Sequence, residues 1–133
     1  MNRKGIVDSK IILPELSYAL TGLCFEAHNA LGRFRPERSY GDFMEKRLGE
    51  MGMSYVREHA LEKREHIVDF LIEGKIVLEL KAKRLLEKQD FYQLQRYLQV
   101  SQVKLGLLVN FRNRYLKPVR VVRIDTDARQ RFV

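Results

Sequence analysis

The fold is decided by His66-Ile67-Val68-Asp69-Phe70-Leu71-Ile72, followed by Glu73-Gly74 and then by Lys75-Ile76-Val77-Leu78-Glu79-Leu80-Lys81. Two runs rich in β-branched and other apolar residues flank the Glu-Gly pair. Such runs are typical of strands, and glycine supplies the positive φ angle that a tight turn needs. The stretch therefore predicts a β-hairpin at the centre of the chain.

Three charged residues interrupt these apolar strands, namely Asp69 on the first and Glu79 and Lys81 on the second. A carboxylate in a covered strand is costly unless it is paired, hydrogen-bonded or bound to a cation. Glu79 and Lys81 are two residues apart, so both project from the same face of one strand. The alternative is an edge strand that carries charge for solubility, which the dense apolar flanks argue against.

The length of the turn decides whether the two carboxylates meet. A two-residue turn at Glu73-Gly74 would place Asp69 opposite Leu78. A three-residue loop from Glu73 to Lys75, or an equivalent bulge, makes the numbers of facing residues sum to 148 and places Asp69 opposite Glu79. We predict this second register, in which facing Cβ atoms lie ~4.5–5.5 Å apart.

Two converging carboxylates form a site for a hard divalent cation, Mg²⁺ or Mn²⁺, because neither a thiolate nor a histidine cluster accompanies them. Such a metal polarises a phosphoryl group and activates water. The amine of Lys81 would hold a phosphate oxygen or orient the attacking water. The histidines have no metal-ligand spacing, and Cys24 is expected to be a small core residue.

Working outward from the hairpin, periodicity predicts helices and strands along the rest of the chain. The expected order is α-α-β-β-β-α-β-β, and because helices and strands mix without strict alternation we expect an α/β fold with a mixed sheet flanked by helices. A single domain over residues 1–133 is expected, with a core of about 12–124 and short flexible ends. The predicted elements are helices 14–31, 36–49 and 87–100 and strands 54–61, 66–72, 75–81, 104–111 and 119–124.

Composition narrows the function classes. The 133 residues are 45% apolar and 32% charged, which is typical of a globular protein. No apolar run approaches the ~20 residues of a membrane span, and no secretory signal is visible, so we expect no membrane partner. One cysteine excludes an internal disulfide and a thiolate cluster and favours the cytoplasm. The net charge of +8 favours a polyanionic partner, although many small proteins are basic for solubility alone.

Four motifs together carry a family resemblance. Asp69 followed by Glu79-x-Lys81 resembles the D…(D/E)-x-K core of the PD-(D/E)XK nuclease superfamily, and more narrowly the chain resembles its GxxExxY branch. The matching stretches cover roughly residues 15 to 124 and are Glu37-Arg38-Ser39-Tyr40, Val68–Ile72, Val77–Ala82 and Gln93–Leu98 followed by Lys104–Phe111. One departure is Phe34, which stands where the G-x-x-E pattern has glycine.

The resemblance implies a restriction-endonuclease-like domain and assigns roles within it. Asp69 and Glu79 would be the principal metal ligands, Lys81 the catalytic lysine, and Glu37 a helical acid that reaches the metal directly or through water. Gln93 would lie beside the active site, four residues from Tyr97 on one helix face.

Each of these roles has a plainer alternative. An acid at a helix start suits the helix dipole, Gln93 is an ordinary helix-surface residue, and Tyr97 is a packing residue. The basic residues Lys83, Arg84, Arg112 and Arg114, expected near strand ends, would grip phosphates beside the site or simply be solvated, and Tyr97 is also a candidate contact with nucleic acid.

The function that follows is a Mg²⁺- or Mn²⁺-dependent nuclease acting on nucleic acid. We expect DNA rather than RNA as the substrate, although no base-reading motif distinguishes them. The alternatives are a nuclease-like protein that binds nucleic acid without cutting it, and a small interaction protein or subunit. A homodimer would supply surface that so short a domain lacks.

Overall fold

The computed structural model describes residues 13–60 and 67–124. The expected flexible ends, together with Leu61 and His66 at the ends of two predicted strands, lie outside these residues. Within them the elements follow the predicted order α-α-β-β-β-α-β-β. They are α2 (Pro14–Leu31), α3 (Glu37–Glu50), β1 (Tyr55–Ala60), β2 (Ile67–Ile72), β3 (Ile76–Lys81), α4 (Lys88–Ser101), β4 (Leu105–Asn110) and β5 (Val119–Val122).

The helix boundaries follow from proline and glycine. Pro14 opens α2 at a position where a missing N–H costs nothing, and Gly32 ends that helix with a φ of 79°, so the predicted bounds are confirmed. The prediction that α3 includes Pro36 is wrong. The extended backbone of Pro36 (φ −65°, ψ 154°) makes it the N-cap, and the helix begins one residue later at Glu37.

The five strands form one mixed sheet in the order β1-β2-β3-β4-β5. The β3–β4 pair is parallel and the other pairs are antiparallel, as the prediction of a mixed sheet requires. The parallel pair is joined through α4, as parallel strands need a crossover connection. β4 is buried along its whole length, which agrees with its nearly continuous apolar run.

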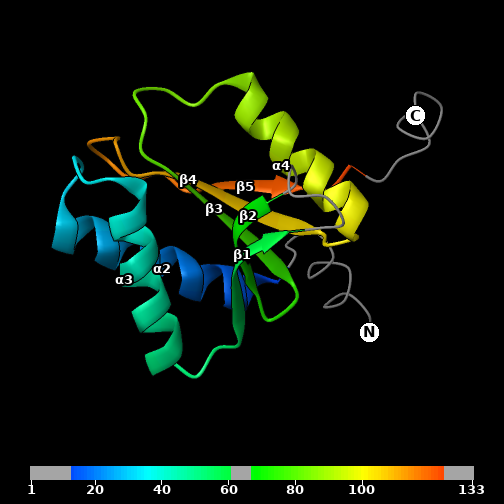
Figure 1. Cartoon of the computed structure of the whole chain (residues 1–133), viewed down its shortest axis with the longest axis horizontal. Coiled ribbons are helices and arrows are strands. Elements are labelled where there is room, and N and C mark those ends of the chain that lie inside the picture. The colour runs from blue at the N-terminus through cyan, green and yellow to red at the C-terminus, as the bar shows by residue number, and fades with distance from the viewer. Residues whose placement is uncertain (1–12, 61–66, 125–133) are drawn as a thin grey trace, which may run out of the picture.

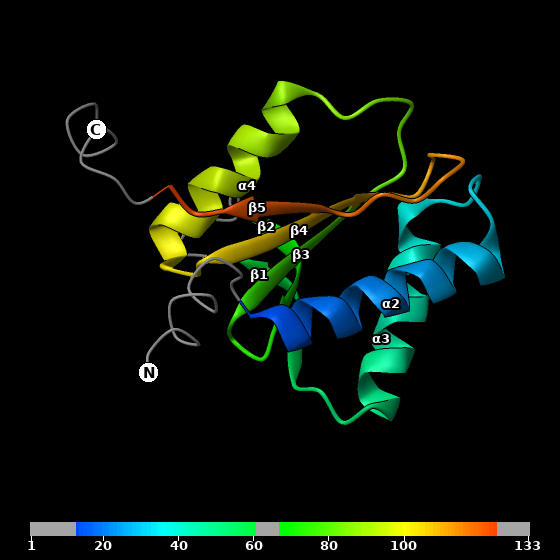
Figure 2. The same cartoon turned by 180° about the vertical axis from the view of Figure 1, so that it is seen from behind.

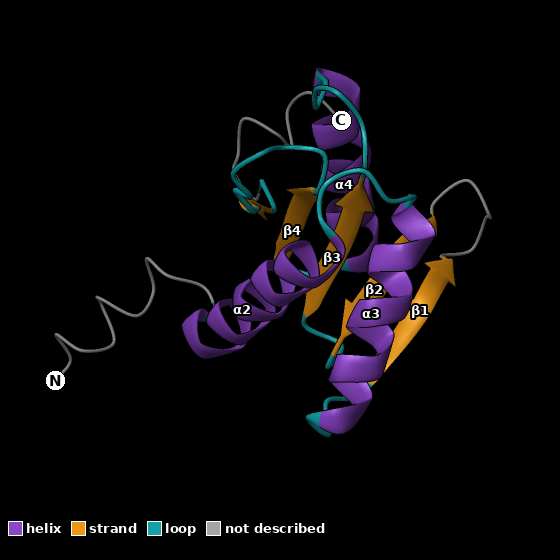
Figure 3. Ribbon diagram, turned by 90° about the vertical axis from the view of Figure 1, so that its left-hand side faces the viewer, coloured by secondary structure: helices purple, strands orange, loops and turns teal. Residues whose placement is uncertain are grey.

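Helices cover the sheet on both faces (Figures 1 and 2). Figure 3 shows α2 and α3 in front of the strands with α4 behind them. The apolar core is accordingly divided in two. The larger cluster joins α2 and α3 to residues such as Phe70, Leu78 and Val109, and the smaller one joins α4 to residues such as Val77 and Leu108.

None of the helices within residues 13–60 and 67–124 has both the length and the apolar character needed to cross a membrane.

Candidate active site

The β2–β3 hairpin has the predicted register. Phe70 pairs with Leu78 and Ile72 with Ile76, so the numbers of the paired residues sum to 148. Glu73 and Gly74 take positive φ angles of 55° and 65°, and the N–H of Lys75 closes the loop on the carbonyl of Ile72 at 2.9 Å. The three-residue loop brings Asp69 and Glu79 level with each other.

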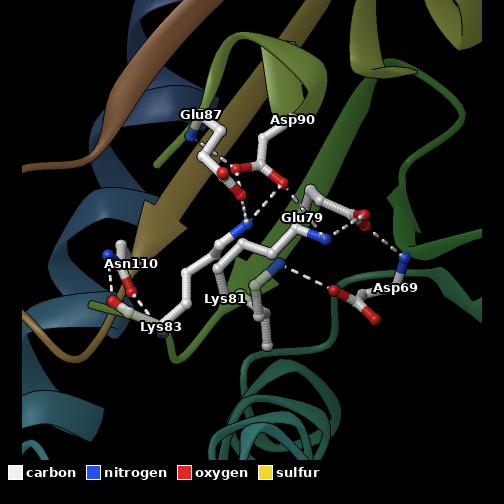
Figure 4. A network of polar contacts seen from close by, with 8 residues as sticks. Asp69, Glu79, Lys81, Lys83, Glu87, Asp90 and Asn110 are labelled. Atoms are coloured by element: carbon white, nitrogen blue, oxygen red, sulfur yellow. Dashed lines mark hydrogen bonds and ion pairs between the residues drawn. The ribbon is translucent and has the colours of Figure 1, made fainter. Parts of the chain in front are cut away.

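At that level the side chains take part in contacts between the strands. The N–H of Asp69 donates to Oε1 of Glu79 at 3.0 Å, and the N–H of Leu80 donates to Oδ2 of Asp69 at 2.6 Å (Figure 4). Each carboxylate is thus fixed by the backbone of the neighbouring strand. These two hydrogen bonds give each carboxylate the partner that a charged group needs in a covered strand.

The distortion extends into β1. Its paired residues flank Glu58, which has a positive φ of 55°. A left-handed conformation in a residue with a side chain costs ~1–2 kcal/mol. Glu58, the strained residue, therefore lies beside Asp69. Backbone strain of this kind often clusters at functional sites.

The alternation of β2 is interrupted at the same point. Val68 packs in the α4 cluster, whereas Phe70 packs in the α2–α3 cluster. As a result the carboxylates line separate cavities: Asp69 lines one of about 420 Å³ with Glu37, and Glu79 lines one of about 290 Å³ with Gln93. The two acids are nevertheless adjacent across the strand gap, and their side chains are in hydrogen-bond contact with each other.

The amine expected beside the acids is present. Nζ of Lys81 lies 3.7 Å from Oε2 of Glu79 and 3.8 Å from Oδ1 of Asp90. Asp90 also holds Lys83, whose Nζ lies 3.0 Å from its Oδ2 and 2.9 Å from Oε1 of Glu87. Figure 4 shows the two lysines converging on the start of α4.

Asp90 was not singled out from the sequence. It is 6% exposed, and it forms a capping box with Glu87, whose N–H donates to Oδ2 at 2.7 Å. The available signal was an acid three residues after a helix N-cap, which is ordinary by itself. Its contact with Lys83 spans only seven residues, and its contact with Lys81 depends on how the connection between β3 and α4 brings the helix start back to the end of the strand.

The electrostatics reflect two acids held close together out of water. Burial, and next the charge of Asp69, raise the pKa of Glu79 to about 8. Burial also raises the pKa of Asp69, opposed by its hydrogen bond from Leu80. Perturbed pairs of this kind are typical of functional sites.

A model of the PD-(D/E)XK nuclease superfamily matches residues 14–124. The chain belongs to this superfamily. The match spans every described helix and strand, and the five-stranded mixed sheet flanked by helices is a restriction-endonuclease-like fold. Comparison with curated proteins and with solved structures gave no match.

Two further candidates of the PD-(D/E)XK site lie beside the acids. Glu37 opens α3; desolvation and the charge of Asp69 raise its pKa, whereas Lys81 and the N–H of Ala82 lower it. Gln93 is an exposed residue of α4 in the cavity that Glu79 lines. Among the described residues, no three His, Cys, Asp or Glu side chains are grouped closely enough to hold a metal.

The candidate nucleic-acid contacts fall into three groups. Lys83 is in the ion-pair network, and Arg84, Arg112 and Arg114 line a separate surface cavity. Tyr97 is 1% exposed and packs in the α4 cluster, which supports its interpretation as a packing residue. Tyr97 also lines the cavity of Glu79 and Gln93, and its contact with nucleic acid stays a prediction.

Proposed function

We propose that the protein is a divalent-metal-dependent nuclease that hydrolyses phosphodiester bonds in nucleic acid, DNA before RNA. The observation that carries the proposal is the interlocking of Asp69 and Glu79 across the strand gap with the amine of Lys81 beside them. A protein that only binds nucleic acid has no evident need for two partly buried acids where phosphate must approach. Membership of the PD-(D/E)XK superfamily supports the same activity.

Within the superfamily we place the chain in the GxxExxY branch. Two of the resembling motifs support each other in space. Tyr40 is fully buried, its ring stacks on Phe111 with centroids 4.1 Å apart, and its hydroxyl donates to the carbonyl of Gly32. The E-x-x-Y tyrosine thus anchors the start of α3, and with it Glu37, to the end of β4.

The donor set fits Mg²⁺ or Mn²⁺. Mg²⁺ is commonly held by one or two carboxylates together with substrate phosphate and water, and Asp69 and Glu79 supply two carboxylates whose positions are fixed by backbone N–H groups. Glu37 lines the cavity of Asp69 but is not grouped closely with both acids, so it would contribute through water. A divalent cation held here supplies Lewis-acid polarisation of the scissile phosphate when bound.

The other side chains act on charge and position. Lys81 provides a positive charge beside the acids, where it stabilises the negative charge that develops on the phosphoryl oxygens. Asp90 and Glu79 keep that amine in place through ion pairs on either side. Gln93 lies on the Glu79 side, where its amide is available to orient water or substrate.

The test is cleavage of labelled single-stranded, double-stranded and branched DNA and of RNA, with Mg²⁺ or Mn²⁺ and with EDTA. We expect metal-dependent cleavage by the wild type and its loss in Asp69→Asn and Glu79→Gln, with salt-sensitive binding retained. Lys81→Met should slow cleavage about 10²–10³-fold, by analogy with the loss of one charge-stabilising group. Glu50→Gln, a surface change at the far end of α3, is the matched control and should cleave like the wild type.

A wild-type protein that binds nucleic acid without cutting it would overturn the proposed nuclease activity. The alternative of a non-catalytic nucleic-acid-binding protein would then remain. If it neither cuts nor binds, the small interaction protein remains. Cleavage that survives in Asp69→Asn and Glu79→Gln would show that other residues perform the chemistry.

A further inference from the structure

A basic and aromatic groove lies beyond the ends of the parallel strands β3 and β4, outside the candidate active site. It has a volume of about 500 Å³, within the range of small-ligand sites. We refer to it as the arginine groove. Its lining includes Arg33, Phe34, Arg84, Arg112, Arg114 and Tyr115.

No carboxylate among the described residues compensates the charge of the groove. None of its arginines forms an ion pair with a carboxylate in the part of the chain that the structure describes. Two arginines elsewhere do pair with carboxylates: Arg47 contacts Glu26 and Glu50, and Arg57 contacts Asp42 and Glu45. Gathering four unpaired guanidinium groups costs electrostatic free energy that an anionic partner would offset.

Aromatic rings stand open among these charges. Phe34 is 72% exposed and Tyr115 is 77% exposed. The guanidinium carbons of Arg33 and Arg112 lie 4.8 and 5.6 Å from the centroid of the Phe34 ring, and that of Arg114 lies 5.3 Å from that of Tyr115. Rings and guanidinium planes are the surfaces on which unpaired bases stack, whereas the faces of paired bases are hidden inside a duplex.

The groove is held in shape before any partner arrives. Nε of Arg33 donates to the carbonyl of Arg112 at 2.9 Å, and Nε of Arg112 donates to the carbonyl of Arg33 at 3.0 Å. This reciprocal pair ties the α2–α3 connection to the β4–β5 connection. His28 adds a contact of 2.9 Å to the carbonyl of Asn113. A preformed surface saves ordering entropy on binding.

The groove is also close to the candidate active site along the chain. Phe34 precedes Glu37 by three residues, and Arg84 follows Lys81 by three residues. Three residues span at most roughly 11 Å. One strand of nucleic acid that occupies the groove can therefore continue to the acids.

From these observations we infer that the arginine groove binds unpaired nucleotides, so that a single-stranded segment is the substrate class of the proposed nuclease. The bases stack on Phe34 and Tyr115, and the arginines contact the phosphates. The inference deepens the proposed function, because the bound single strand is a substrate only if the protein is a nuclease. The binding itself is testable without cleavage.

The experiment measures fluorescence anisotropy of labelled oligonucleotides of about 20 nucleotides, long enough to span one such site, in EDTA. The probes are oligothymidylate, oligouridylate and a mixed-sequence DNA duplex. We expect Phe34→Ala and Tyr115→Ala each to weaken single-strand binding about 5- to 100-fold, with duplex binding changed less than about twofold. The double variant Arg84→Gln/Arg114→Gln should reduce the magnitude of the slope of log K against log salt concentration by about one to two.

Tyr18→Ala is the matched control. Tyr18 is 82% exposed on the first turns of α2, about 20 Å along the helix from the groove, and its loss should leave every affinity unchanged. Retained single-strand affinity in both Phe34→Ala and Tyr115→Ala would overturn the inference, as would an equal loss for the duplex. Comparing oligothymidylate with oligouridylate separates DNA from RNA as the source of the unpaired nucleotides.

Failure of the groove and failure of the proposed function give different results. Asp69→Asn should bind single strands like the wild type and not cut them. If cleavage depends on metal but the aromatic variants bind single strands normally, the proposed nuclease activity stands and the inference about the arginine groove fails. Single-strand binding that depends on Phe34 and Tyr115, in a protein that never cuts, would keep the groove and remove the nuclease.

Discussion

Glu79 accepts a hydrogen bond from the backbone N–H of Asp69 at 3.0 Å, so one candidate metal ligand is fixed by the main chain of the other. In return the Asp69 carboxylate receives the N–H of Leu80 at 2.6 Å. The acids thus hold β2 to β3 at the level where they would also act on substrate. Changes at either residue affect folding and chemistry together, and their effects are separated only when both are measured.

Glu79→Gln should stabilise the metal-free protein at alkaline pH. The folded pKa of about 8 lies above the ordinary value of 4.5, so the unfolded chain gives up this proton first as the pH rises. Wild-type stability should therefore fall between about pH 4.5 and about pH 8, by up to about 5 kcal/mol. Glutamine is neutral throughout and keeps an oxygen for the Asp69 N–H, so the variant should lack this fall.

Urea denaturation in EDTA across this pH range measures the difference. Glu50→Gln removes a carboxylate at an exposed position and controls for the change of net charge. Parallel pH profiles for Glu79→Gln and the wild type would show that Glu79 is not held in a desolvated site.

Gly106→Ala should loosen α4 from the sheet. A Cβ at Gly106 would lie 3.0 Å from both Cδ atoms of Leu94, a buried residue of α4. Overpacking of this kind costs ~1–3 kcal/mol. Gly22→Ala is the matched control, because the helix position has no atom within 4 Å of the new Cβ and alanine is the better helix former, by up to ~1 kcal/mol. Thermal unfolding should shift in opposite directions for the two variants.

Asp90 should matter through its charge as well as its cap. Asp90→Ala removes the acceptor for the Glu87 N–H and the ion pairs to Lys81 and Lys83, and it should cost ~1–3 kcal/mol of unfolding free energy. Asp90→Asn keeps an acceptor for the N–H and should cost less. Both variants should slow cleavage, because Lys81 loses a partner. Equal stability losses in urea would show that the cap contributes little.

The sequence predicted those features that depend on neighbours along the chain. Pro14 and Gly32 marked the ends of α2, and Gly74 together with the three-residue loop gave the hairpin register. The same register placed Asp69 level with Glu79. Local backbone chemistry was sufficient for the helix ends, whereas the register was chosen because only the three-residue loop lets the two carboxylates meet.

Features that depend on contacts across the fold were not predicted. A regular strand would put Val68 and Phe70 on one face, but they pack in different clusters, and the interruption falls at Asp69, whose side chain contacts the backbone of β3. Phe34 was noted only as the departure from the G-x-x-E pattern, and Tyr115 was not singled out, because no periodicity links residues on two separate connections. For Tyr97 the structure supports packing, and its predicted contact with nucleic acid is untested.

Asn110 should prove a structural link between the active-site strand and the arginine groove. It is 2% exposed at the end of β4. Its Oδ1 accepts the N–H groups of Lys83 at 3.1 Å and Arg112 at 3.3 Å, and its Nδ2 donates to the carbonyl of Lys83 at 2.7 Å (Figure 4). Asn110→Ala leaves these backbone groups without their partner and should cost roughly 2–4 kcal/mol.

Asn110→Asp offers a sharper test than alanine, because it keeps the acceptor and loses the donor. At about pH 8 the introduced carboxylate faces the carbonyl of Lys83, whereas at about pH 5 a protonated carboxyl can donate to it again. The variant's deficit in unfolding free energy should therefore shrink as the pH falls, and that of Asn110→Ala should not. Single-strand affinity should follow the same trend, since Arg84 lies next to the segment that Asn110 holds. A deficit in Asn110→Asp that does not change with pH would mean that the donor contact to Lys83 carries little of the link.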